Sequence, residues 1–192
     1  REINLNITRH NPASITLEIP SASTHHQVVM LSSDIHFDAK YCDLDLFSQH
    51  LKLAEERKAP VVIADDFFDT MQGHDDPRRS IEELKEKYRV SSYFDALVQD
   101  ASTYLHKFQV PYYIIALGNH ETSVLRKINT NLTERLAYDL RLHGQQAESM
   151  GYWGYIRFMF SYRKGNGAVS KILYFHHGKS TGAVVTKGVI QV

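Results

Sequence analysis

The sequence predicts an α/β protein, because short apolar runs typical of buried strands alternate with helical patterns along its 192 residues. The apolar runs cover residues 28–31, 61–64, 112–117 and 171–175. Each run is followed by residues able to bind a metal ion. In open α/β sheets the ligand site lies outside the carboxyl ends of the strands. Four such endings in one chain therefore predict a site at one edge of a sheet.

The N-terminal part of the chain is expected to lie apart from the main domain. Residues 3–20 alternate loosely in polarity and are interrupted at Asn11-Pro12, which indicates a hairpin or an extended arm. We therefore expect an arm or hairpin over residues 1–26 and a second unit over residues 27–192. The run at 28–31 predicts a strand buried on both faces, leading to Asp34 and His36.

The next elements follow from apolar spacing and from proline. Apolar residues recur at helical spacing over residues 43–57, and Pro60 ends that pattern. The run at 61–64 predicts a second strand, which leads to Asp65 and Asp66. A polar loop over residues 70–80 and a long helical region over residues 81–108, broken near residues 90–92, are expected to follow.

The second half of the chain continues the alternation. A strand at 112–117 leads to Gly118-Asn119-His120-Glu121, and residues 131–142 carry one apolar stripe typical of a helix. Strands are expected at 152–162 and 171–175, with a turn at residues 165–167 between them. The last of these strands leads to His176-His177-Gly178.

Composition excludes several classes of protein. Lys and Arg together number 22, equal to Asp and Glu together, so no overall basic field favours nucleic acid or anionic membranes. A single cysteine, Cys42, excludes an internal disulfide framework. No stretch reaches the roughly 20 apolar residues of a membrane span, and no leader opens the chain, so we expect a cytoplasmic protein without a membrane partner.

The residues at the strand ends suit a metal centre. Asp34 and His36 stand two residues apart, where an extended chain points both to one side. The two carboxylate oxygens of Asp66 can bind two cations at once. Asn119 adds an amide oxygen and either His176 or His177 adds a nitrogen, so the ligands are nitrogen and oxygen without thiolate. Such a set favours manganese first, with iron or zinc as alternatives.

Two residues beside these ligands are candidates for acid–base chemistry. His120 follows Asn119 directly, within reach of a substrate held by the metals, and could protonate a leaving alkoxide. Glu121 could orient that imidazole. Two divalent ions roughly 3.5–4 Å apart activate water and stabilise the charge of an in-line displacement, which suits a phosphate ester as substrate.

In this order, Asp34-x-His36, Asp66-x-x-Asp69, Gly118-Asn119-His120-Glu121 and His176-x-Gly178 resemble the signature of the calcineurin-like metallophosphoesterase family. The resemblance covers residues 28–178. It implies a four-layer α-β-β-α sandwich with two mixed sheets and a dinuclear metal site. It also implies that Asp66 bridges the two ions and that His120 acts on the leaving group. Of the two adjacent histidines it favours His176, because the family's pattern is His-x-Gly.

The chain departs from the family's pattern at two places. Asp65 stands where the family has glycine. The family's final Gly-His-x-His element is missing, so each metal lacks a histidine. We expect the parent chain to continue past Val192 to that element within about 40 residues, a span judged from the ordinary lengths of a further helix, a strand and their connections.

The resemblance implies a hydrolase of phosphate esters of the phosphodiesterase or nuclease branch, with a nucleic acid or a nucleotide as a possible partner. The alternatives are a phosphomonoesterase, a non-catalytic scaffold of the same fold, and a mononuclear metal hydrolase of unrelated fold. Asp65 and the missing histidines favour the scaffold, whereas Asn119, His120 and Glu121 favour the enzyme. Four cations on expected loops could hold a phosphate, although solvated surface charge explains them more simply: Arg78, Arg79, Arg126 and Lys127.

Overall fold

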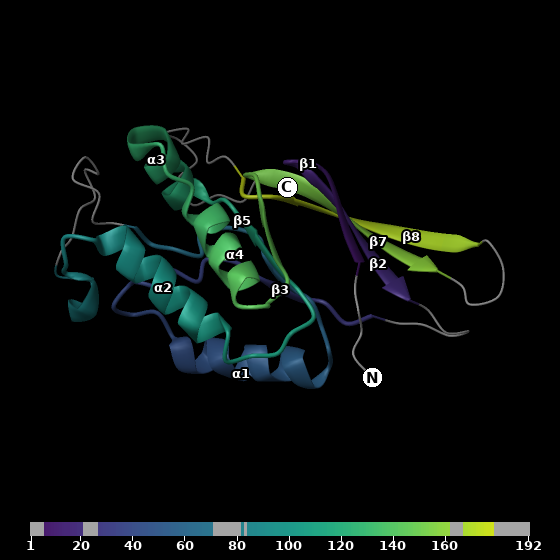
Figure 1. The fold of residues 1–192 in the computed structure, drawn as a ribbon, viewed down its shortest axis with the longest axis horizontal. Helices are drawn as coiled ribbons and strands as arrows, with labels where there is room; N and C mark the ends of the chain where they lie inside the picture. The colour runs from purple at the N-terminus through teal and green to yellow at the C-terminus, as the bar shows by residue number, and fades with distance from the viewer. Residues whose placement is uncertain (1–5, 21–26, 71–81, 83, 162–166, 179–192) are drawn as a thin grey trace, which may run out of the picture.

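The computed structural model describes residues 6–20, 27–70, 82, 84–161 and 167–178. Within these residues the protein contains two four-stranded sheets and four α-helices, which confirms the α/β class (Figure 1). One sheet is entirely parallel and the other is mixed, so the expectation of two mixed sheets is wrong for the first. No helix among the described residues is long and apolar enough to cross a membrane.

The parallel sheet has the strand order β3-β4-β5-β6. Its strands are β3 (Met30–Ser32), β4 (Val61–Ile63), β5 (Tyr113–Ala116) and β6 (Ala147–Met150). Because all four run in the same direction, their carboxyl ends lie at one edge. The two central strands are buried throughout, but β3 at the sheet's margin is not, since Leu31 is 58% exposed. Burial on both faces was therefore the wrong expectation for the first strand.

The mixed sheet has the strand order β1-β2-β7-β8 and joins the two ends of the described chain. Strands β1 (Asn6–Asn11) and β2 (Ser14–Pro20) form an antiparallel pair, and β2 also pairs in parallel with β7 (Trp153–Ser161). Strand β8 (Ala168–His176) pairs antiparallel with β7. Strand β8 is longer than expected and largely exposed. The expectation of a buried strand beside β3, β4 and β5 is therefore wrong, because β8 belongs to the mixed sheet.

Helices α1 (Leu44–Glu56), α2 (Tyr93–Leu105), α3 (Asn119–Ile128) and α4 (Leu132–Leu142) contribute to the core on one face of the parallel sheet (Figure 1). Helix α2 is shorter than the helical region expected over residues 81–108, and a 3-10 turn, Glu86–Tyr88, precedes it. Helix α3 and strand β6 were not expected. The polar loop at 71–80 and the turn at 165–166 lie outside the described residues.

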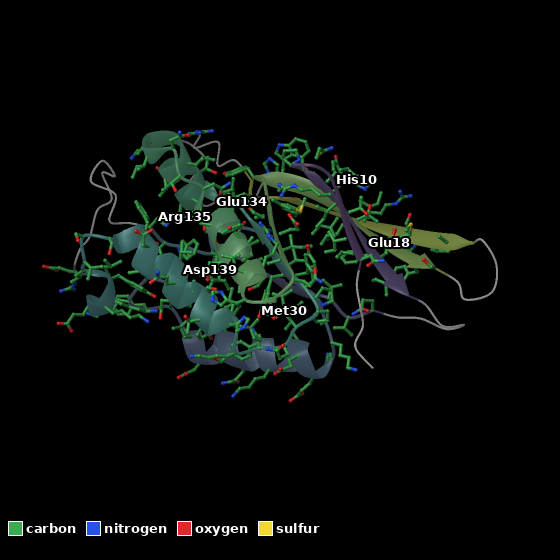
Figure 2. The ribbon with its side chains drawn as sticks, viewed as in Figure 1. His10, Glu18, Met30, Glu134, Arg135 and Asp139 are labelled. Carbon is green, nitrogen blue, oxygen red and sulfur yellow. The ribbon has the colours of Figure 1, made fainter. Side chains whose placement is uncertain are left out.

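Two apolar cores hold these layers together, and alternate residues of the parallel strands contribute to each. Val61, Ile63 and Ile115 pack with the helices, whereas Val62 and Ile114 pack against the mixed sheet. Figure 2 shows side chains filling the region around the helices and the two sheets, with His10 and Glu18 on the mixed sheet. This arrangement leaves the carboxyl edge of the parallel sheet as the place where loops from several strands meet.

Candidate metal centre

Residues from both sheets meet at the carboxyl edge of the parallel sheet. The loop after β3 carries His36, the loop after β4 carries Asp66, and α3 begins directly after β5 with Asn119 and His120. His177 follows the last residue of β8 and reaches the same place from the mixed sheet. The structure thus brings together five of the residues that the sequence analysis singled out.

The backbone around the site is held in an uncommon conformation. Asp34, His36 and Asp66 have φ angles of 50°, 48° and 30°, a left-handed region that residues other than glycine seldom occupy. Hydrogen bonds fix the two loops side by side, because His36 N donates to Asp66 O at 3.1 Å and Phe37 N donates to Phe67 O at 2.8 Å. Strained backbone held in this way is concentrated at functional sites.

His36, Asp66 and His120 form a group that could hold one metal ion. One ligand atom from each lies within 4.8 Å of the others. Asp66 is buried, at 3% exposure, and the two imidazole rings meet edge to face with their centroids 4.9 Å apart. Two nitrogens and a carboxylate oxygen are donors that suit manganese, iron or zinc.

Asp69 orients both imidazoles of this group. Its Oδ1 lies 3.0 Å from His36 Nδ1, and its backbone carbonyl accepts a hydrogen bond from His120 Nδ1. The hydrogen bond to Asp69 raises the pKa of His36, while burial opposes that shift. The backbone N–H of Asp69 donates to the buried Asp38 at 2.7 Å. Sequence reasoning gave no role to Asp38 and treated Asp69 only as part of a motif, although both stand beside predicted ligands.

Glu121 joins two loops of the site. Its Oε1 accepts a hydrogen bond from Phe68 N at 2.7 Å, and its Oε2 accepts one from Gly118 N at 3.0 Å. The side chain is fully buried, and burial raises the pKa of Glu121 to about 8. Both carboxylate oxygens of Glu121 thus accept hydrogen bonds from backbone N–H groups. The His120 ring, which Glu121 was expected to orient, contacts Asp69.

A second group of donors also lies near Asp66. His177 Nε2 is 2.6 Å from Asn119 Oδ1 and 3.6 Å from Asp66 Oδ2. The other oxygen of Asp66 accepts a hydrogen bond from His120 N at 3.0 Å. Asp66 is therefore close both to the His36 and His120 imidazoles and to His177, whose ring contacts Asn119.

Two of the predicted ligands lie farther out. Asp34 has 62% of its side chain exposed, and its Oδ1 is 3.9 Å from His36 Nε2, at the margin of the site. His176 is exposed, and its Nδ1 accepts a hydrogen bond from Gly178 N at 2.7 Å. The structure therefore places His177, rather than its neighbour, beside Asn119.

A cavity of about 320 Å³ opens next to the second group. Its lining contains two of the cations that the sequence analysis considered for phosphate binding, together with hydroxyl and amide groups: Asn119, Thr122, Ser123, Arg126, Lys127 and Tyr152. The other two such cations, Arg78 and Arg79, lie outside the described residues. Because Asn119 belongs to both the cavity and the donor group, a molecule in this cavity would touch the site.

Comparison with protein-family models, with curated proteins and with solved structures finds no match for this chain. The resemblance to calcineurin-like metallophosphoesterases therefore rests on the motifs and their spacing. The geometry of the site stands independently of that resemblance, since it follows from the described residues alone.

Proposed function

We propose that this chain is a metal-dependent hydrolase of phosphate esters, with phosphodiesters, including those of nucleic acid, as its substrates. The observation that carries the proposal is the position of Asp66, a buried carboxylate close to His36 and His120 and also to His177, which contacts Asn119. Such a carboxylate can serve two cations at once. Its place at the carboxyl edge of a parallel sheet agrees with where α/β folds bind ligands.

The fold supports the proposal at a coarser level. The described residues give a layer of helices, a parallel sheet and a mixed sheet, packed in that order through two cores. These correspond to three layers of the four-layer α-β-β-α sandwich that the resemblance implies. We include the complete sandwich in the proposal.

The donors fit two divalent ions of the manganese, iron or zinc kind. His36 offers nitrogen beside Asp66, and His177 offers nitrogen together with the Asn119 amide oxygen, while His120 beside them is kept for the proton. When bound, such ions polarise a phosphoryl oxygen and make water more acidic. We propose manganese as the native metal, since imidazole and oxygen ligands without thiolate suit it.

His120 has the geometry of a proton donor to the leaving group. Its Nδ1 lies against the carbonyl oxygen of Asp69, which can only accept, so Nδ1 carries a proton. This leaves Nε2 to exchange a proton with substrate. The neighbouring cavity places Arg126 and Lys127 on the same side as Asn119, where cationic groups suit a phosphate or a second anionic group of the ester.

The test is hydrolysis by the chain loaded with Mn²⁺. Bis(p-nitrophenyl) phosphate, p-nitrophenyl phosphate and a short oligonucleotide represent a diester, a monoester and a nucleic acid. We expect turnover that needs Mn²⁺ and stops with EDTA, faster for diesters than for the monoester. His120→Ala should lower kcat about 100- to 10,000-fold, the usual contribution of a general acid.

The matched control is His50→Ala, which removes an exposed histidine of α1 far from the site in the sequence and should leave kcat unchanged. A metal-loaded chain that is inert toward all three substrates would favour the non-catalytic scaffold. Faster cleavage of the monoester would instead make the protein a phosphomonoesterase.

A further inference from the structure

We propose that Asp65 is a positioning residue that orients His177, so that His177 and not His176 supplies the nitrogen ligand on the Asn119 side of Asp66. This inference rests on the metal centre of the proposed function. It also accounts for the aspartate at a position where the resemblance leads one to expect glycine.

The contacts of Asp65 link three strand ends. Its Oδ2 lies 2.8 Å from His177 Nδ1, and its Oδ1 accepts a hydrogen bond from Asp34 N at 3.2 Å. The side chains of Asp65 and His177 are only 13% and 12% exposed, so water competes little for this contact. One carboxylate thus connects the loops after β3 and β4 with the residue that follows β8.

The orientation of the ring follows from this contact. His177 Nδ1 is buried and has no well-aligned hydrogen bond among the described residues, and the Asp65 carboxylate is the acidic group beside it. Without a metal ion Nε2 donates to Asn119 Oδ1, because an amide oxygen can only accept. A metal ion bound at Nε2 would replace that proton, and the carboxylate then favours the proton on Nδ1. A carboxylate behind a ligating imidazole is the usual support of such ligands, because it fixes the orientation of the ring.

The other ring nitrogen, Nε2, points to the proposed metal position. His177 Nε2 lies 2.6 Å from Asn119 Oδ1 and 3.6 Å from Asp66 Oδ2, so an imidazole nitrogen, an amide oxygen and a carboxylate oxygen converge. These donor types are the ones expected of a manganese, iron or zinc ligand set. The ring edge also rests against Tyr152, with centroids 4.8 Å apart, which limits its rotation.

His176 lacks each of these features. Successive residues of an extended chain point to opposite sides, so two adjacent histidines cannot both face the site. His176 is exposed, and its Nδ1 already accepts the hydrogen bond from Gly178 N. The pair therefore divides into one histidine toward the donors and one toward the surface, which makes His176→Ala a matched control for His177→Ala.

Calorimetric titration of the metal-free chain with Mn²⁺ tests the assignment directly. We expect two binding events in the unmodified chain, one of which is lost in His177→Ala. Asp65→Ala should weaken the same event about 10- to 100-fold, as removal of a carboxylate behind a ligand usually does. His176→Ala should bind Mn²⁺ like the unmodified chain. Loss of a binding event in His176→Ala but not in His177→Ala overturns the proposal.

Two further measurements separate positioning from a general structural effect. With diamagnetic Zn²⁺ bound, nitrogen-15 NMR of the His177 ring should show the proton on Nδ1 in the unmodified chain and a tautomer mixture in Asp65→Ala. Asp65→Asn keeps an acceptor oxygen and should recover most of the Mn²⁺ affinity. An Asp65→Ala chain with unchanged affinity and unchanged tautomer contradicts the inference, whatever its thermal stability.

The outcome is distinguishable from failure of the proposed function. A chain that binds Mn²⁺ as expected but hydrolyses no phosphate ester leaves the role of Asp65 intact and removes the enzyme. Conversely, an active chain in which neither Asp65→Ala nor His177→Ala alters Mn²⁺ binding keeps the enzyme and removes the role of Asp65. A chain that binds no Mn²⁺ overturns both.

Discussion

Gly118 lies so close to Asp66 that no side chain fits between them. A Cβ atom on Gly118 would lie 1.9 Å from Asp66 Oδ1 and 2.3 Å from Asp66 N. The φ angle of Gly118 is −94°, which any residue can adopt, so the requirement is one of space and not of backbone freedom. The loop after β5 can therefore pass the central carboxylate only because this residue is glycine.

Gly118→Ala should displace Asp66 and weaken both stability and metal binding. Overpacking of a well-packed interior costs typically about 1–3 kcal/mol, and the backbone atom in contact here makes the upper end the expected value. Urea unfolding without metal measures the stability, and Mn²⁺ titration measures the site. Gly151→Ala is the control, because its Cβ would meet nothing closer than 3.7 Å. Equal stability of the two variants would contradict the close packing.

At this scale the sequence predicts the residue types better than their contacts. The strand-end rule points to His36, Asp66 and His120, because it needs only apolar runs and the residues that follow them. The contacts of Asp38 with Asp69 depend on how two loops approach each other, which no spacing reveals. The choice between His176 and His177 depends on the register of β8, because a shift of one residue along the strand exchanges the side chains that face the site and the surface.

The elements differ in how clearly their sequences specify them. Helix α1 was predicted almost to its ends, since its apolar residues recur at helical spacing and its first turn is capped by Asp43. Strand β6 was missed because Ala147-Glu148-Ser149-Met150 lacks β-branched and aromatic residues, so pairing with β5 decides its structure. Helix α3 was missed although Glu121, three residues after Gly118, is a helix-start signal.

Helix caps give a prediction at the scale of one element. The side chain of Asn131 accepts a hydrogen bond from Glu134 N at 3.1 Å at the start of α4, whereas Ser92 at the start of α2 makes no such bond. Asn131→Ala should therefore lower the free energy of unfolding by about 1 kcal/mol. Ser92→Ala should change it by less than about 0.5 kcal/mol. Thermal unfolding of both variants compares them, and a larger loss in Ser92→Ala would refute the assignment of the caps.

The whole molecule depends on its N-terminal hairpin. Ile15, Leu17 and Ile19 of β2 are buried between the two sheets, where they pack with Ile114 and Phe158. The sequence predicts a hairpin or an arm there. It carries no signal for the parallel pairing of β2 with β7, because parallel pairs are not joined by a local turn. Long-range pairing of this kind is decided by the folded molecule as a whole.

Leu17→Ala tests whether the hairpin belongs to the cooperative core. Removal of a fully buried leucine side chain usually costs about 2–5 kcal/mol, and we expect a loss in that range with one unfolding transition. Thr8→Ala in β1 removes an exposed side chain and should cost less than about 0.5 kcal/mol. Guanidinium unfolding followed by circular dichroism measures both. A negligible loss for Leu17→Ala would show that residues 6–20 are an appended arm.

The parallel pairing of β2 with β7 also matters while the protein is being made. Ser14 pairs with Tyr155, so the ribosome must add about 140 residues after β2 before its partner exists. At 5–20 residues per second this takes on the order of 10 s. During that time Ile15, Leu17 and Ile19 lack the neighbouring strand β7, and until β4 and β5 are made they also lack the parallel sheet that covers them. The newly made hairpin is therefore an apolar segment open to chaperones and to aggregation. The yield of this protein should therefore depend more on the rate of its synthesis and the supply of chaperones than on the stability of the folded state.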